Sequence, residues 1–262
     1  MKMNYVLVVR ELLKGTNMNK KRILVVNDDG FDAIGIQILA RHLTKYGDVV
    51  VYAPADHQSA QSQAITVFRP LKREEVFDLG YKCYKIDGKP ADCVRFATGI
   101  EEEFDLVVSG INNGFNIGID TLYSGTVGAA TDANLHGISS IAISAPRGKV
   151  EDFEKYLDMT LEKCFEIGKL FNGNMYCLNV NFPEDAENVK GFKITRVGYF
   201  VDDITMIEYN QGFRPAKYNL DYDLNNKDID YTAHKEGYIS ISPLTPDKTH
   251  NEHYKFLKEQ LK

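Results

Sequence analysis

The sequence lacks three features that would each point to a particular class of protein. Its four cysteines form no C-x-x-C pair and no zinc spacing, so we expect reduced, mostly buried thiols of a cytoplasmic protein. No apolar run is long enough to span a membrane, and residues 1–19 lack the long apolar core of a signal peptide. Because the net charge is −6, we expect no general binding to duplex nucleic acid.

The clearest positive signal is a short apolar run that ends in acidic residues. Residues 23–26 read Ile-Leu-Val-Val, and Asn27-Asp28-Asp29-Gly30 follows directly. A short apolar run closed by a turn signal predicts a strand buried on both faces. Neighbouring strand residues point to opposite faces, so the two carboxylates converge only if the chain turns, which Gly30 permits. Such a pair favours a hard divalent cation, although capping of the next helix is the simpler alternative.

Strand and helix patterns alternate along the chain up to about residue 150. The expected strands cover residues 23–26, 48–54, 65–70, 81–86, 104–110, 140–144 and 176–182. Helices are expected after the first strand, from Pro90 onward, from about residue 124, and over residues 151–170. This alternation predicts an α/β fold with a mostly parallel sheet and right-handed crossovers. Ligands of such sheets bind beyond the carboxyl ends of the strands.

The pattern changes in the last third of the chain. Residues 202–230 are polar, rich in Tyr and Asn, and too weakly periodic for a core element. We interpret this stretch as an extended arm or long hairpin that leans on a partner subunit. We therefore expect an amino-terminal arm or over-extended start (1–19), a catalytic domain (20–185) and a carboxyl-terminal extension with a hairpin and a helix (186–262).

A second candidate site lies at the start of the helix of small residues. Ser124, Gly125 and Thr126 stand at its amino end, where free N–H groups and hydroxyls bind anions readily. Capping of the helix is the simpler alternative for the two hydroxyls. Tyr123 could stack on a nucleotide base or lie in the core, and we favour the core. We interpret Asp92 as a group that caps or orients the start of its own helix.

Several short motifs follow one another in order from about residue 20 to the 240s. They are Asn27-Asp-Asp-Gly30, Gln58-Ser-Ala60, Gly88-Lys-Pro-Ala-Asp-Cys-Val94, Ser109-Gly-Ile-Asn112, Gly114-Phe-Asn-Ile-Gly118, Tyr123-Ser-Gly-Thr-Val127 and Gly237-Tyr-Ile-Ser-Ile-Ser-Pro-Leu244. The ordered set resembles the SurE family of stationary-phase survival proteins. That family consists of metal-dependent phosphatases that act on nucleoside 5′- and 3′-monophosphates.

The resemblance implies a Rossmann-like three-layer α/β/α fold with a swapped carboxyl-terminal extension that forms homodimers or homotetramers. It also implies one divalent cation per subunit, held by Asp28, Asp29, Ser59 and Asn112. All four offer oxygen, which fits Mg²⁺ or Mn²⁺ better than zinc. We further hypothesise that one aspartate orients the attacking water, and Asp28 is a better candidate than Asp29 for this catalytic role. Asn116 and the segment Ser124-Gly125-Thr126 are the candidate phosphate-binding groups.

The chain departs from the family pattern at two places, and its general acid is open. Ser62 and Gln63 stand where the family usually has a Gly-His pair, and Lys89 replaces a threonine. His234 is our candidate for the acid that protonates the leaving group, ahead of His57. Each of these histidines is more often a packing or surface residue than a proton donor.

Other classes of protein fit the opening motif less well. A receiver-like signalling module would also bind Mg²⁺ at an acidic pair, without phosphatase turnover. It would need a third aspartate at the end of a central strand and a lysine on a later strand, and neither is found. An aspartyl-phosphate phosphatase would have Asp-x-Asp-x-Thr after the first strand, and a dinucleotide dehydrogenase would have Gly-x-Gly-x-x-Gly.

Overall fold

The structure, a computed structural model, describes residues 20–76, 80–100, 103–199, 206–215 and 225–261. The expected arm over residues 1–19 lies outside these ranges. Among the described residues, no helix combines the length and the apolar character needed to cross a bilayer. All four cysteines are free and buried, as predicted.

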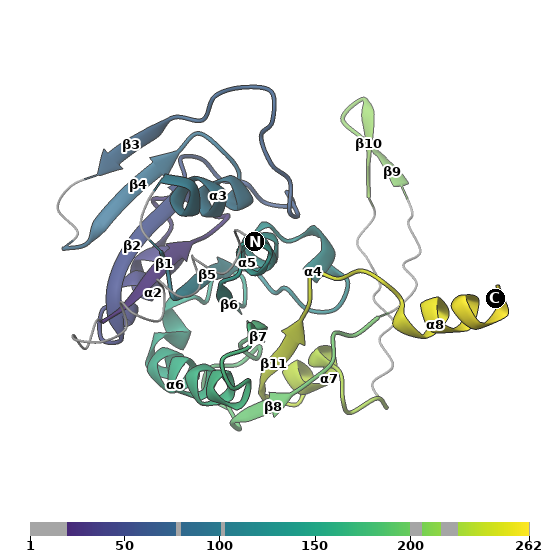
Figure 1. Ribbon diagram of the computed structural model, residues 1–262. Helices are drawn as coiled ribbons and strands as arrows, with labels where there is room; N and C mark the ends of the chain where they lie inside the picture. The colour runs from purple at the N-terminus through teal and green to yellow at the C-terminus, as the bar shows by residue number, and fades with distance from the viewer. Residues whose placement is uncertain (1–19, 77–79, 101–102, 200–205, 216–224, 262) are drawn as a thin grey trace, which may run out of the picture.

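The centre of the molecule is a nine-stranded sheet in the order β3-β4-β2-β1-β5-β6-β7-β11-β8 (Figure 1). Its strands are β1 (Lys21–Val26), β2 (Gly47–Pro54), β3 (Arg73–Val76), β4 (Lys82–Ile86), β5 (Leu106–Asn113), β6 (Ser139–Ala145), β7 (Cys177–Asn181), β8 (Phe192–Ile194) and β11 (Ile239–Leu244). The strands from β4 to β7 in this order are parallel. Only β3 and the pair β11–β8 run the other way, so the predicted mostly parallel sheet is confirmed.

Helices cover both faces of the sheet and make a three-layer fold. They are α2 (Ile34–Leu43), α3 (Pro90–Ile100), α4 (Asp120–Tyr123), α5 (Gly125–Leu135), the 3₁₀ turn η1 (Glu151–Phe153), α6 (Glu154–Leu170), α7 (Asp230–Lys235) and α8 (Asn251–Gln260). Alternate residues of β1 point to opposite faces. Ile23 and Val25 pack in one core with α2 and α6, while Leu24 and Val26 pack in a second core with α3 and α5.

The order of the strands decides where a ligand can bind. From β1 the chain first builds outward through β2 to β4 and β3, and then returns to place β5 on the other side of β1. Loops that leave β1 and β5 therefore diverge, which opens a crevice at the carboxyl ends of these strands. Asp28 and Asp29 follow β1, and Asn112 lies near the end of β5, so the fold brings them to this crevice.

Two expected strands differ from the structure. Residues 65–70 form no strand, because the N–H and hydroxyl of Thr66 donate to the Asp92 carboxylate at 2.8 and 2.6 Å instead of pairing with a strand. β5 does not stop at Gly110. It continues past an irregularity to Asn113, so Asn112 is a strand residue and not a loop residue.

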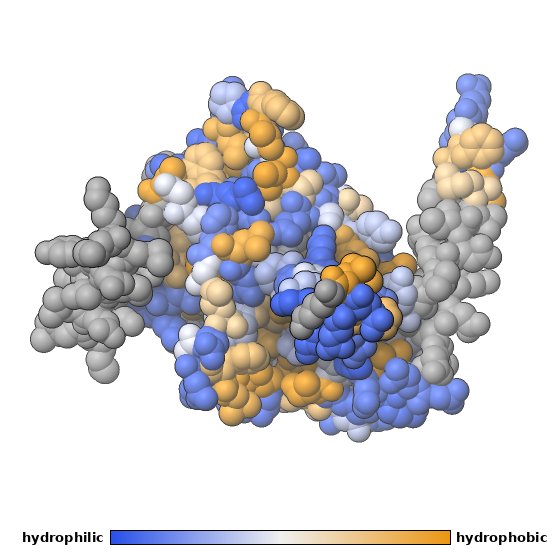
Figure 2. All heavy atoms as spheres, turned by 45° about the vertical axis from the view of Figure 1, so that its right-hand side comes forward, coloured by the Kyte–Doolittle hydropathy of each residue, from blue (hydrophilic) through white to orange (hydrophobic). Residues whose placement is uncertain are grey.

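The carboxyl-terminal part of the chain both completes the sheet and extends from it. β8 and β11 join the sheet beside β7, and β9 (Met206–Tyr209) pairs with β10 (Gly212–Pro215) as a separate hairpin. The hairpin stands away from the sheet, and Figure 2 shows hydrophobic side chains on it. The predicted hairpin and terminal helix are therefore present, while the division into three regions stays a prediction.

Candidate functional site

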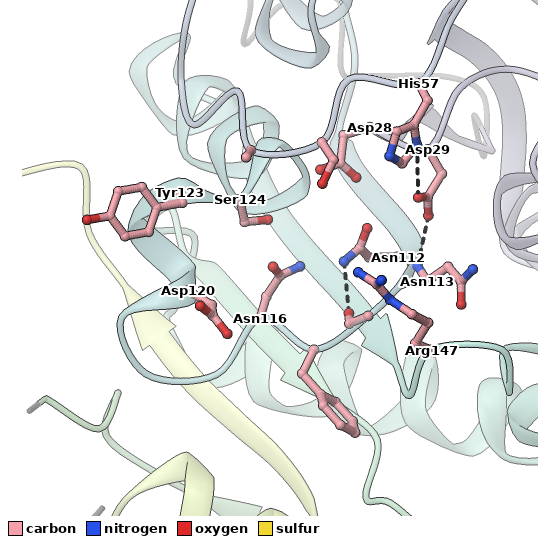
Figure 3. A pocket seen from close by; sticks show the side chains of 14 residues that line it. Asp28, Asp29, His57, Asn112, Asn113, Asn116, Asp120, Tyr123, Ser124 and Arg147 are labelled. Carbon is pink, nitrogen blue, oxygen red and sulfur yellow. Dashed lines mark hydrogen bonds and ion pairs between the residues drawn. The ribbon is translucent and has the colours of Figure 1, made fainter. Parts of the chain in front are cut away.

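A cavity of about 470 Å³ lies at the carboxyl ends of β1, β5 and β6. Figure 3 shows the side chains that surround it. Its lining consists of Asp28, Asp29, His57, Ser59, Ala60, Asn112, Asn113, Gly114, Phe115, Asn116, Asp120, Tyr123, Ser124 and Arg147. The four predicted metal ligands are all in this set, although 84 residues separate the first from the last of them along the chain. Burial and backbone contacts show how each is held.

The turn after β1 presents both carboxylates to the same cavity. Gly30 has a φ of +96°, a left-handed conformation that side chains disfavour, and its carbonyl accepts a 2.7 Å hydrogen bond from Asn27 Nδ2. The Asp28 carbonyl accepts from the N–H of Gln58 at 2.7 Å. The Asp29 carboxylate accepts from the N–H of Asn113 at 2.8 Å, which ties β1 to the end of β5.

The electrostatics of the pair favour a cation. Asp28 is 4% exposed, and burial raises the pKa of its carboxyl above the usual range. The hydrogen bond from Thr126 opposes this shift, and the negative charge of Asp29 adds to it. Two carboxylates so close, one of them buried, are held in an unfavourable state that a bound cation would relieve.

Ser59 and Asn112 complete the set of oxygen donors. Ser59 is exposed in a turn after β2. Within the described part of the chain, its hydroxyl has no hydrogen-bond partner. Asn112 uses its Nδ2 to donate to the Gly114 carbonyl at 2.8 Å, which leaves its Oδ1 to face a ligand. Two carboxylates, a hydroxyl and an amide oxygen fit a hard divalent cation such as Mg²⁺ or Mn²⁺.

The two departures after Ser59 have structural roles. Ser62 has a φ of +54°, a conformation that glycine adopts easily, and its N–H and hydroxyl donate to the carbonyls of Tyr123 and Leu122. Gln63 donates through Nε2 to the buried Asp132 at 3.2 Å. Both residues therefore anchor the Ser59 loop to the region of α4 and α5. Lys89, at the other place where the chain departs from the family pattern, does not line the cavity.

The start of α5 contributes in a different way from the one predicted. The Ser124 hydroxyl lines the cavity and also caps the helix, accepting from the N–H of Val127 at 3.0 Å. Thr126 is fully buried and donates to Asp28 Oδ1 at 2.5 Å. Gly125 has no room for a side chain, because a Cβ there would lie 2.8 Å from Asp28 Cβ. Of the three residues, only Ser124 therefore borders the cavity itself.

Asn116 is held by residues that the sequence reasoning missed. Its Nδ2 donates to Ser144 Oγ at 2.8 Å, which leaves a second N–H for a ligand. Its backbone is bound on both sides by the amides of Asn179 and Asn181, and all three of these partners are buried. The available signal was two asparagines within the apolar strand β7, where a side chain without a partner would be costly.

His234 lies behind the cavity and does not line it. Its ring packs edge-on against Phe115, a lining residue, with 4.2 Å between the ring centres. Burial lowers the pKa of this histidine, and the charge of Lys235 lowers it further, against an opposing effect of Glu184 at 4.0 Å. His57 does line the cavity, with its Nδ1 3.5 Å from Asp29 Oδ1.

Several other lining residues were missed or misplaced at the sequence level. Tyr123 is 60% exposed at the cavity rim, so its interpretation as a core residue is wrong. Asp92 does orient the start of α3, because its carboxylate accepts from the N–H of Lys89. Asp120 and Arg147 border the cavity as well. Asp120 begins α4, and only Arg147, two residues after the end of β6, has a position that could have suggested a place in the site.

Comparison with known proteins agrees with this arrangement. The sequence model of the family described as "Survival protein SurE" matches residues 23–201. The chain belongs to the SurE family. The curated protein "5'-nucleotidase SurE" from Caldanaerobacter subterraneus subsp. tengcongensis is 38% identical over 252 residues, which are 92% of this chain and 97% of that protein. The protein of the same name from Legionella pneumophila is 37% identical over 247 residues, covering 92% and 97%.

A solved structure of the SurE family has the same fold. The SurE protein from Aquifex aeolicus matches with a TM-score of 0.74 and 32% identity, over 92% of this chain and all of that one. The predicted Rossmann-like α/β fold and the resemblance to SurE are both confirmed. The receiver-like alternative is not favoured, because SurE relatives extend over nearly the whole chain.

Proposed function

We propose that this SurE protein is a metal-dependent phosphatase that hydrolyses nucleoside 5′- and 3′-monophosphates to nucleoside and phosphate. One observation carries the proposal: Asp28, Asp29, Ser59 and Asn112 border one cavity, and the amino end of α5 borders it too. Oxygen ligands for a cation thus lie beside groups that bind an anion, which is what a phosphate monoester requires. The name "5'-nucleotidase SurE" of the relatives supports this substrate class.

In this proposal Asp28, Asp29, Ser59 and Asn112 hold one Mg²⁺ or Mn²⁺ per subunit. Such a cation supplies positive charge to phosphoryl oxygens and acidifies water. Asp28 has a second role as the group that orients the attacking water. Its Oδ1 is fixed by the Thr126 hydroxyl, so its other oxygen can accept a hydrogen bond from water on the cavity side.

The phosphate would be bound from the opposite wall. Ser124 offers a hydroxyl, and Asn116 offers the N–H that Ser144 does not use. Gly125 would act through its backbone N–H at the first turn of α5, which the helix itself leaves without a partner. Thr126 would act through Asp28 instead, because its N–H and its hydroxyl both donate to that carboxylate. His234 remains the predicted general acid. His57 is the alternative, because it borders the cavity directly.

The same proposal includes an assembly. We propose a homodimer or homotetramer in the cytoplasm, formed through the carboxyl-terminal extension. Its hairpin and terminal helix leave large hydrophobic side chains exposed, which is typical of an interface. These are Met206, Ile207, Tyr209 and Phe213 on the hairpin, and Tyr254, Phe256 and Leu257 on α8. Light scattering of the purified protein would give the number of subunits, and a monomer at micromolar concentration would contradict this part.

The deciding experiment measures phosphate release from a panel of nucleoside monophosphates. It is run with Mn²⁺, with Mg²⁺ and with a chelator, on the wild type and on Asp28→Asn. We expect metal-dependent release that falls at least about a hundredfold in the variant. Asp32→Asn is the matched control, because it removes an exposed carboxylate four residues away that does not line the cavity.

Two further results of this experiment would contradict the proposal. One is release that continues in the presence of chelator, since no cation would then be needed. The other is turnover by Asp28→Asn close to that of Asp32→Asn. Calorimetric binding of Mn²⁺ to the same proteins checks separately whether the acidic pair holds the cation.

A further inference from the structure

Arg147 stands out among the residues that line the cavity. The lining includes three carboxylates, from Asp28, Asp29 and Asp120. Arg147 is the one lining residue that carries a permanent positive charge. Figure 3 shows its guanidinium turned toward Asn112, inside the pocket. A cation at this point faces the same space as the proposed metal ligands and Asn116.

The turn that carries Arg147 is fixed to the strand that carries Asn112. β6 ends at Ala145, which pairs with Asn113 of β5. The N–H of Gly148 then donates to Asn113 Oδ1 at 2.6 Å, and Gly148 has a φ of +74°, which a glycine accepts without strain. Arg147 is therefore bracketed by two attachments to the edge of the site, and its backbone position is set.

The side chain of Arg147 differs from its cationic neighbours. Lys149 donates to the Glu184 carbonyl at 3.0 Å, and Lys155 pairs with Glu187 at 2.7 Å. For Arg147 we find no hydrogen bond or ion pair to any residue within the described ranges. A guanidinium has five N–H donors in a fork that matches phosphate geometry. This one is left with all of them available to a ligand in the cavity.

We propose that Arg147 binds the phosphate group of the substrate, from the β6 side of the cavity and opposite the Ser124 end of α5. This inference rests on the proposed function and adds a residue to its phosphate site. A phosphate monoester brings up to two negative charges into a cavity that already has three carboxylates. Arg147 offsets part of this repulsion, and it binds free inorganic phosphate, the product, by the same contacts.

The test compares Arg147→Ala, Arg147→Lys and Lys155→Ala with the wild type. Lys155→Ala is the matched control, because it removes a positive charge that pairs with exposed Glu187 outside the cavity. The first readout is binding of inorganic phosphate by calorimetry in the presence of Mn²⁺. We expect Arg147→Ala to weaken it about tenfold, Arg147→Lys to recover part of the loss, and Lys155→Ala to change it less than twofold.

The second readout is the steady-state kinetics of nucleotide hydrolysis. We expect KM in Arg147→Ala to rise about tenfold, as the affinity for phosphate falls. Inhibition by inorganic phosphate should weaken by a similar factor. Phosphate affinity and KM equal to those of Lys155→Ala would overturn the inference. If the wild type hydrolyses no nucleotide, the proposed function fails, yet the calorimetric comparison still decides whether Arg147 binds phosphate.

Discussion

The hydroxyl of Thr126 donates a 2.5 Å hydrogen bond to Asp28 Oδ1, although 98 residues separate them in the sequence. Both side chains are buried, at 0% and 4% exposure. The bond joins the end of β1 to the first turn of α5, so the proposed metal ligand and the proposed phosphate-binding helix cannot move independently. It also favours the ionised form of Asp28, against the effect of burial on its pKa.

Replacing Thr126 with Val should impair the site while keeping its shape. The variant leaves the Asp28 carboxylate without its hydroxyl partner, so we expect a loss of about 1–3 kcal/mol in the free energy of unfolding near neutral pH. The pKa of Asp28 should rise further, so the midpoint of the pH dependence of Mn²⁺ binding should shift upward. Thr126→Ser keeps the hydroxyl and should bind Mn²⁺ like the wild type. Identical pH midpoints for Thr126→Val and Thr126→Ser would contradict this account.

Gly128 should tolerate no side chain. A Cβ there would lie 2.1 Å from the carbonyl oxygen of Ser62, so Gly128→Ala has to displace the loop that carries Ser59. We expect it to lower the free energy of unfolding by about 1–3 kcal/mol and to weaken Mn²⁺ binding. Gly99→Ala is the matched control, because it also lies in a helix but has open space at its Cβ. It should be neutral or stabilising by up to about 1 kcal/mol, as measured by chemical denaturation.

Gln63 should anchor the Ser59 loop through Asp132. Asp132 is fully buried and is also bound by Arg95 at 3.1 Å, so it keeps a partner when Gln63 is removed. We therefore expect Gln63→Ala to cost only about 1 kcal/mol of stability and to affect Mn²⁺ affinity moderately. Gln63→His restores the residue common in the family and a ring N–H, so it should retain wild-type affinity. A loss in Gln63→His as large as in Gln63→Ala would argue against this anchor.

His234 should make stability depend on pH in a known direction. Its folded pKa lies below the ordinary value of about 6.5, so the unfolded chain binds more protons as pH falls through that region. Above about pH 6.5 the imidazole is neutral in both states, so its burial does not oppose folding. As the pH falls toward the folded pKa, the unfolded chain takes up the proton first and the folded state loses stability. His234→Gln should flatten the dependence of the unfolding free energy below about pH 6.5.

The same variant tests the proposed chemical role of His234. A general acid contributes through proton transfer, so its removal should lower kcat at least about a hundredfold. A packing residue behind Phe115 should leave kcat much closer to that of the wild type. His57→Gln, measured beside it, decides between the two candidate histidines, because His57 lies in the cavity and is exposed.

The strands predicted wrongly show what local pattern cannot provide. Residues 65–70 look like a strand, but the partner that binds Thr66 is a carboxylate of α3, a contact that exists only in the folded chain. The role of Thr126 was likewise predicted as a ligand contact. Its actual partner, Asp28, is brought to it by the pairing of β1 with β5 and the crossover to α5.

Local sequence by itself determined the buried strands, the turn at Gly30 and the pairing of two carboxylates, because periodicity and glycine act over a few residues. The ordered motifs determined the family and its set of oxygen donors. Only the tertiary structure decided which residues share the cavity. Arg147 has no local signature of function, and the asparagines of β7 show only that they need partners, without showing which. Each of these residues acquires its place from the order of strands in the sheet. Pairing between strands far apart in the sequence thus positions the residues of the site, and the local sequence motifs supply their chemical groups.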